Sequence, residues 1–181
     1  RTPLNAVINF SKAMRKGIPG PVNAKQEQLL DGIADSGQHL LDLINDVLDI
    51  YKIEADSFKL FIEPNLDIRA IIQFAVNMSK PLLGDKPVEI QQDIADTLPL
   101  ISGDRKRLLQ IMLNLLSNAC KFTEKGYVKV SAKADDDHIL IAVQDTGFGI
   151  DASDAKGVFE AFKQTESGLR QGGGTGLGMP L

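Results

Sequence analysis

Apolar residues recur at alternating spacings of three and four through the first third of the chain, and this repeat restricts the fold severely. The positions, within a helix expected from about residue 24 to residue 55, are Leu30, Ile33, Gly37, Leu40, Ile44, Val47 and Tyr51. The repeat keeps apolar side chains on one stripe of an α-helix and is typical of a coiled coil or a helical bundle. Such a stripe needs a second helix to cover it.

A shorter helix is expected before this one. Residues 4–16 carry apolar side chains at mixed helical spacings, and the glycines and prolines of residues 17–21 would end the helix. The two helices together predict a hairpin. Leu29, Leu41 and Leu48 broaden the apolar face beyond what one hairpin covers, so two hairpins from two chains would form a four-helix bundle. The alternative is a hairpin that packs on the C-terminal part of its own chain.

After residue 56 the pattern changes to a mixture of strands and helices, which predicts the α+β fold class. Four segments are expected to be strands: residues 58–62, 88–94, 127–131 and 138–143. Asp67 and Asp104 are expected to cap two helices at their first turns. One apolar face is expected on the second of these helices, formed by Leu108, Ile111, Met112, Leu115 and Ala119.

The composition excludes several function classes. With 43% hydrophobic and 24% charged residues, the 181-residue chain is in the ordinary soluble globular range. The formal net charge of −4 argues against nucleic acid as a partner, because phosphate backbones attract clustered Lys and Arg. No apolar run approaches the ~20 residues that a membrane-spanning helix needs, so we expect no membrane contact. The single cysteine, Cys120, fits a reducing, cytoplasmic setting.

Polar residues interrupt the helix that follows Asp104. Asn114, Asn118 and Lys121 are spaced by four and three, so they share one helix face. An amide oxygen can bind Mg²⁺ without adding charge, and an ammonium group can neutralise phosphate oxygens. This face is therefore a candidate phosphate and magnesium site, and the alternative is an ordinary exposed polar face.

Glycines gather near the end of the chain, where nine of the 16 fall within residues 147–178. Asp145, at the end of an expected strand, is followed by Gly147 and Gly149, and its carboxylate could accept a hydrogen bond from an adenine amine. The backbone N–H groups of residues 172–178 could bind phosphates. The alternatives are a simple tight turn and a flexible tail.

These elements, in this order, resemble the sequence boxes of the sensor histidine kinases of two-component systems. Residues 114–122 are similar to the N box, 145–150 to the G1 box, 159–162 to the F box, 172–178 to the G2 box and 1–5 to the end of the H box. The resemblance covers essentially the whole chain. Five boxes in order are far more specific than any one of them.

The resemblance implies two domains. Residues 1–56 would be the dimerisation and phosphoacceptor hairpin, and residues 57–181 an α/β sandwich of the Bergerat type that binds ATP. The implied function is a cytoplasmic homodimer that binds Mg-ATP and phosphorylates a histidine on the dimerisation helix. The phosphoryl group would then pass to an aspartate in the receiver domain of a response regulator.

The resemblance also implies residue roles in nucleotide binding. Asn118 would bind Mg²⁺, Asn114 and Lys121 would lie by the phosphates, and Phe122 would lie against the base. Asp145 would accept a hydrogen bond from the adenine amine, with Gly147 and Gly149 allowing close approach. The triphosphate would be lined by Gly172, Gly173, Gly174, Thr175, Gly176, Leu177 and Gly178.

The resemblance implies two further roles, one in phosphoryl transfer and one in dephosphorylation of the partner. Arg170, in an expected lid of residues 165–171, would reach the γ-phosphate or else stay in solvent. Thr2 would orient a water that dephosphorylates the partner, or else cap or kink the first helix. Asn5, Asn9, Lys12 and Lys16 would belong to the face that docks the receiver domain.

The chain departs from the family pattern in three places. The phosphoacceptor histidine is expected three residues before Arg1, so this chain as given is not expected to phosphorylate itself there. The ATP-binding domain is expected to continue beyond Leu181, and Ala161 stands where the F box usually has proline. Two other functions remain open: another ATPase of the same superfamily, of the Hsp90 or MutL type, and a dimeric scaffold without catalysis.

Overall fold

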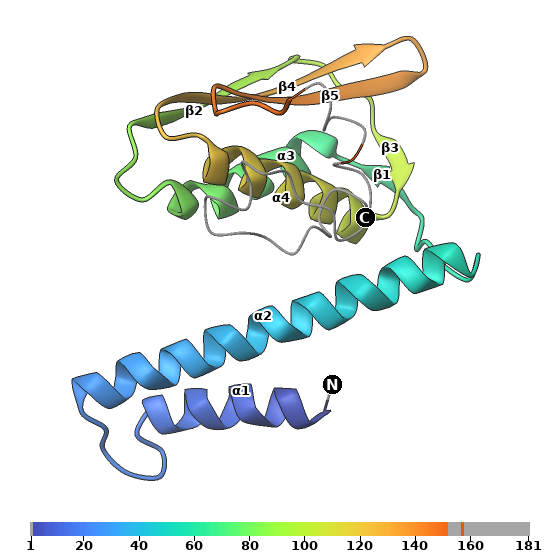
Figure 1. The fold of residues 1–181 in the computed structure, drawn as a ribbon. Coiled ribbons are helices and arrows are strands. Elements are labelled where there is room, and N and C mark those ends of the chain that lie inside the picture. Colours follow the sequence, from blue (N-terminus) through green and yellow to red (C-terminus); the bar gives the residue numbers. More distant parts are fainter. Residues whose placement is uncertain (1, 152–156, 158–181) are drawn as a thin grey trace. The chain divides into compact units, whose positions relative to one another are not determined.

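The computed structural model describes residues 2–151 and residue 157 of the chain. It forms two compact units, Arg1–Ser57 and Phe58–Leu181. The first unit contains α1 (Thr2–Arg15) and α2 (Ala24–Glu54), and the second contains the described strands (Figure 1). None of the helices in the described part of the chain is both long enough and apolar enough to cross a bilayer.

The expected helical hairpin is confirmed. Asn23 ends the connection and starts α2 through a capping box, in which its side chain accepts a hydrogen bond from the Gln26 backbone N–H and the Gln26 side chain accepts one from the Asn23 N–H. Gly17 and Gly20, with φ of 69° and 150°, provide the turn between the helices. The sequence therefore fixes both the start of α2 and the reversal before it.

Only part of the apolar repeat on α2 is covered by α1. Leu30, Ala34 and Gly37 are buried, together with Ile8 of α1. A Cβ atom added at Gly37 would lie 2.8 Å from Ile8 Cγ1, so a glycine at this position lets the two helices approach. Seven other large apolar residues of α2 are between 36% and 65% exposed: Leu29, Ile33, Leu40, Ile44, Leu48, Tyr51 and Ile53.

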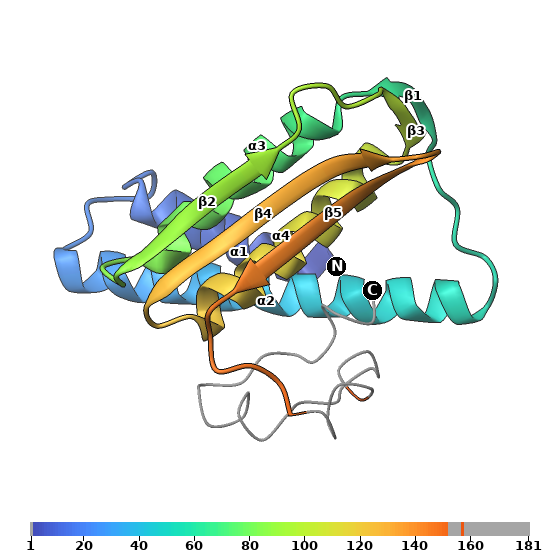
Figure 2. The ribbon, with the colours of Figure 1, turned by 90° about the horizontal axis from the view of Figure 1, so that it is seen from above.

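The second unit has helices on one face of a sheet, which confirms the α+β class. β2 (Val88–Ile94), β4 (Gly126–Asp135) and β5 (His138–Asp145) form one sheet in the order β2-β4-β5, with β2 parallel and β5 antiparallel to β4. α3 (Ile68–Ser79) and α4 (Arg105–Phe122) lie against the same face of it (Figures 1 and 2). A 3-10 helix, η1 (Lys80–Leu83), follows α3.

The core of this unit lies between the two helices and the sheet. Its most deeply buried large side chains include Ile72 and Val76 of α3, Leu116 of α4, and Val128 and Val130 of β4. Both expected helix caps are confirmed, because the Asp67 side chain accepts the Ala70 N–H and the Asp104 side chain accepts the Arg107 N–H.

The expected strand at residues 58–62 is wrong. The strand lies further on, as β1 (Glu63–Leu66), which pairs with β3 (Ile101–Gly103), a strand that sequence reasoning did not identify. The Phe61 N–H donates to the Asp104 carboxylate at 3.0 Å, and the Phe61 side chain is 78% exposed. In this segment the Phe61 N–H therefore pairs with a side chain and not with a neighbouring strand.

The expected apolar face of α4 is partly wrong. Ile111 is 47% exposed, whereas the buried face is formed by Met112, Leu116, Ala119 and Cys120. The apolar residues of α4 cover more than half of its circumference, so periodicity alone did not determine which side packs against the sheet.

Candidate functional site

The polar residues expected to bind phosphate and magnesium lie in the second half of α4. Asn114, Asn118 and Lys121 are all partly buried. The Lys121 Nζ atom lies 5.3 Å from the centre of the Phe122 ring, within the range of a cation–π contact. The described part of the site therefore combines two amides, an ammonium group and an aromatic ring over less than three helical turns.

Asp145 is the last residue of β5, and its side chain is exposed. One carboxylate oxygen, Oδ1, accepts a hydrogen bond from the Gly147 N–H at 2.9 Å. A carboxylate has two oxygens and about four acceptor positions, so acceptor capacity remains for a ligand amine. The hydrogen bond from Gly147 therefore fixes the Asp145 side chain and still leaves acceptor positions open to a ligand amine.

Thr146 fixes the end of β5 to the start of β4. Its hydroxyl accepts the Tyr127 N–H at 3.0 Å and donates to the Lys125 carbonyl at 3.0 Å. A Cβ atom added at Gly126, which has φ of 106°, would lie 2.2 Å from Thr146 Oγ1. Gly126 is therefore required both by its backbone conformation and by the neighbouring hydroxyl.

We expect Gly126→Ala to destabilise the second unit more than Gly84→Ala. Both glycines have positive φ, which costs about 1–3 kcal/mol for an alanine, but a Cβ atom at Gly84 would meet nothing within 4 Å. The contact with Thr146 should add about 1–3 kcal/mol at Gly126. Urea denaturation followed by circular dichroism measures both variants, and equal losses would show that the Thr146 contact has no effect.

Gly147 brings the loop after β5 against the end of α4. A Cβ atom added at Gly147 would lie 2.5 Å from the Phe122 carbonyl oxygen. The structure therefore places the turn that contains Asp145 next to the helix that carries Asn118 and Lys121. Sequence reasoning related Gly147 to the approach of a ligand, but its own chain already requires a glycine there. Gly149, with φ of 73°, needs glycine for its backbone conformation.

Residues that are far from α4 in the sequence form hydrogen bonds at both of its ends. At the N-terminal end, the Phe61 N–H and, to a smaller extent, the Arg107 N–H lower the pKa of the Asp104 carboxyl. At the C-terminal end, the Lys86 ammonium donates to backbone carbonyls of α4. Sequence reasoning found the cap at Asp104 but missed Phe61 and Lys86. No spacing rule could have found them, because they lie 43 and 34 residues from their partners.

Several expected site residues cannot be placed. The F box at residues 159–162, the lid at residues 165–171 with Arg170, and the glycine run all lie outside the described residues. The members of that run are Gly172, Gly173, Gly174, Thr175, Gly176, Leu177 and Gly178. Thr2 is described: it is the first residue of α1 and is exposed.

Two protein families match this chain in sequence. Residues 1–56 match the His Kinase A (phospho-acceptor) domain. Residues 103–181 match the histidine kinase-, DNA gyrase B- and HSP90-like ATPases, and this match includes both α4 and the Asp145 loop. The chain belongs to the sensor histidine kinases. The match to the phospho-acceptor domain falls within the first unit, and the match to the ATPases falls within the second.

Individual relatives agree with this assignment. The histidine kinase core is 39% identical over 184 residues to the circadian input-output histidine kinase CikA of Synechococcus elongatus. It is 39% identical over 182 residues to the histidine protein kinase DivJ of Caulobacter vibrioides. Each match covers 100% of this chain but only 24% of CikA and 30% of DivJ, so the chain spans about a quarter of the length of these relatives.

A solved structure supports the arrangement of the elements. The crystal structure of full-length ShkA in complex with AMPPNP matches with a TM-score of 0.79 and 36% identity. The match covers 99% of this histidine kinase core and 37% of the ShkA chain. The fold described above is therefore similar to that of a protein solved in complex with AMPPNP.

Proposed function

We propose that this histidine kinase core binds Mg-ATP in residues 57–181 and donates the γ-phosphoryl group to a histidine on the dimerisation helix, expected three residues before Arg1. An aspartate of a response-regulator receiver domain then takes the phosphoryl group. One observation carries the proposal. The Asp145 carboxylate, fixed by the Gly147 N–H, lies at the end of β5, and Gly147 in the loop that follows packs against the end of the helix with Asn118 and Lys121.

Each side chain has a defined part in nucleotide binding. Asp145 accepts the adenine amine, and Phe122 lies against the base. Asn114 and Lys121 bind phosphate oxygens. Residues 172–178 line the triphosphate, and Arg170 reaches the γ-phosphate. Positioning and charge neutralisation of this kind are the main contributions of a protein to phosphoryl transfer.

Asn118 fits a magnesium site. Mg²⁺ keeps several waters and is usually bound by one or two protein oxygens together with substrate phosphates. A single amide oxygen on a partly buried helix face, next to an ammonium group, meets that requirement. When bound, the ion supplies charge neutralisation on the phosphates, and Asn118 determines where on α4 it is held.

Calorimetric titration with AMPPNP, in Mg²⁺ and in a chelator, tests the proposal. We expect binding that is tighter with Mg²⁺, and we expect Asn118→Ala to remove this difference. Asn77→Ala, an exposed substitution on α3, is the matched control and should bind like the original chain. If neither this chain nor the complete protein binds AMPPNP, the function as an ATP-dependent kinase is wrong. Acid-labile, base-stable phosphorylation of the complete protein tests the transfer step.

The hairpin is the homodimer interface in this proposal. The support is the row of large apolar residues on α2 that α1 leaves exposed, including Leu40 at 49% and Ile44 at 36%. Burying this row against a second copy removes its apolar surface from water, which stabilises by about 25 cal/mol per Å². The result would be a four-helix bundle.

We expect Ile44→Lys to convert the dimer into a monomer. Two ammonium groups would be buried in one apolar interface, which should raise the dimer dissociation constant by about 100-fold or more. Gln28→Lys places the same charge on the opposite face of α2, where the residue is exposed, and should leave the dimer intact. Sedimentation equilibrium measures both, and a monomeric original chain would contradict the proposed interface.

The exposed face of the first helix is the docking surface for the receiver domain. Its polar residues are all exposed: Asn5, Asn9, Lys12 and Lys16. Thr2, also exposed, orients a water for the reverse, dephosphorylating reaction. Thr2→Ala in the complete protein should slow dephosphorylation of the phosphorylated regulator while leaving AMPPNP binding unchanged. Equal dephosphorylation rates would contradict this role.

A further inference from the structure

The final four carbonyls of a helix have no hydrogen-bond donor within the helix, so those in the last turn of α4 need donors from outside it. The Ala119 carbonyl accepts the Thr123 N–H at 3.1 Å, after which Thr123 is extended and the helix ends. The Phe122 carbonyl packs against Gly147. The carbonyls of Cys120 and Lys121 need a donor from elsewhere in the chain.

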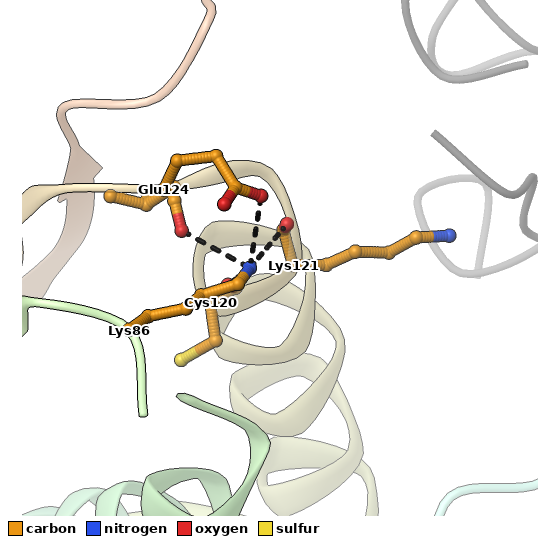
Figure 3. A network of polar contacts seen from close by, with 5 residues as sticks. Lys86, Cys120, Lys121 and Glu124 are labelled. Carbon is orange, nitrogen blue, oxygen red and sulfur yellow. Dashed lines mark hydrogen bonds and ion pairs between the residues drawn. The ribbon is translucent and has the colours of Figure 1, made fainter. Parts of the chain in front are cut away.

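Lys86 provides that donor. Its Nζ atom lies 3.2 Å from the Cys120 carbonyl oxygen, 3.1 Å from that of Lys121 and 3.2 Å from that of Thr123 (Figure 3). An ammonium group has three N–H bonds, so these contacts match its full donor capacity. Glu124 adds an ion pair at 3.4 Å.

The position of Lys86 is itself fixed. It lies between η1 and β2, and its backbone donates to the Leu83 carbonyl at 3.0 Å and accepts the Val88 N–H at 2.8 Å. The side chain is only 27% exposed. Its positive charge faces the end of α4 where the helix dipole is negative, which strengthens the contact. The end of α4 is therefore connected to the first strand of the three-stranded sheet.

The residues that Lys86 fixes belong to the nucleotide site. Lys121 accepts the Lys86 hydrogen bond through its backbone carbonyl, whereas its side chain points away from Lys86 (Figure 3). Asn118 lies one turn earlier on the same helix. We infer that Lys86 is a positioning residue for magnesium and phosphate binding: it contacts neither ligand but fixes the turn of α4 that aims Lys121 and Asn118. This inference rests on the proposed function of the same site.

If Lys86 contributed only to the stability of the second unit, its replacement would have a different effect on ligand binding. General loosening of the unit would weaken adenine binding at Asp145 and magnesium binding at Asn118 alike. A positioning role acts on the helix end, so it should mainly reduce the gain in affinity that Mg²⁺ provides. Loss of a partner that orients a metal ligand typically costs about 10- to 100-fold in metal affinity, so a partial loss of the last turn should be measurable.

The experiment compares AMPPNP affinity in Mg²⁺ with that in a chelator, for the original chain, Lys86→Met and Lys133→Met. Lys133 is an exposed residue of β4 and serves as the matched control. We expect Lys86→Met to lower the ratio of the two affinities by about tenfold, with a much smaller change in the chelator, and we expect Lys133→Met to leave both unchanged. If Lys86→Met leaves this ratio unchanged, either because neither affinity falls or because both fall equally, the inference is overturned.

Two further outcomes are distinguishable. If the original chain itself binds AMPPNP equally with and without Mg²⁺, the magnesium assignment of the proposed function fails and the inference fails with it. If Lys86→Met does not fold, Lys86→Arg replaces it. A guanidinium keeps the charge and the N–H donors, but its planar fork cannot direct three bonds from one atom. The same ratio should then fall by a smaller factor, and an unchanged ratio would again overturn the inference.

Discussion

Leu116→Ala should lower the free energy of unfolding of the second unit by about 2–5 kcal/mol, which is a large part of the stability of a typical domain. The Leu116 side chain is fully buried on α4, within the cluster formed with α3 and β4. Removing it leaves a cavity among side chains that belong to two helices and a sheet. The surrounding backbone is regular, so it cannot collapse to fill the space.

Urea denaturation followed by circular dichroism measures this loss. The matched control is Leu100→Ala, in which the same atoms are removed from a side chain that is 59% exposed, and its cost should stay within about 0.5 kcal/mol. Equal costs at the two positions would contradict the description of the core. The comparison also tests the corrected face of α4, since sequence reasoning assigned Ile111 and not Leu116 to it.

Sequence patterns that span only a few residues predicted most of the fold. The capping residues Asp67 and Asp104 were identified because a cap and the N–H group that it accepts are three residues apart. The strands β4 and β5 followed from the apolar segments at residues 127–131 and 138–143. The strand expected at residues 58–62 failed for the opposite reason. Its polar partner, Asp104, lies 43 residues from Phe61, and no local pattern indicates that contact.

In the candidate site, too, the sequence predicted the local patterns but not the contacts between residues far apart in the chain. The spacing of Asn114, Asn118 and Lys121 on one helix was readable from the sequence, and so was the position of Asp145 at a strand end. The contact of Lys86 with the end of α4 depends on how the chain returns after η1, which composition and periodicity do not encode. The sequence related Gly147 to the approach of a ligand, whereas the constraint that the structure shows is the Phe122 carbonyl of its own chain.

Asp145→Asn should weaken Mg-AMPPNP binding by about 10- to 100-fold, the cost of losing a hydrogen bond to a charged group. A carboxylate offers two oxygens: one accepts the Gly147 N–H, and in the proposed function the other accepts the adenine amine. An asparagine has a single oxygen. If that oxygen stays with Gly147, the amide NH₂ group faces the adenine amine, and two donors meet where a donor and an acceptor met before.

The same reasoning predicts a change in base preference, which separates recognition from general damage. A guanine or hypoxanthine ring presents a carbonyl oxygen where adenine has its amine, so the amide NH₂ group that Asp145→Asn introduces can donate to it. Titration of AMPPNP and of its guanosine counterpart into Asp145→Asn should therefore show a smaller preference for adenine than the original chain has. Asp137→Asn, at the exposed turn between β4 and β5, removes the same charge far from the strand end and should leave both affinities unchanged. Equal losses for the two nucleotides in Asp145→Asn would mean that this carboxylate supports only the turn with Gly147, and that the base is recognised by other residues.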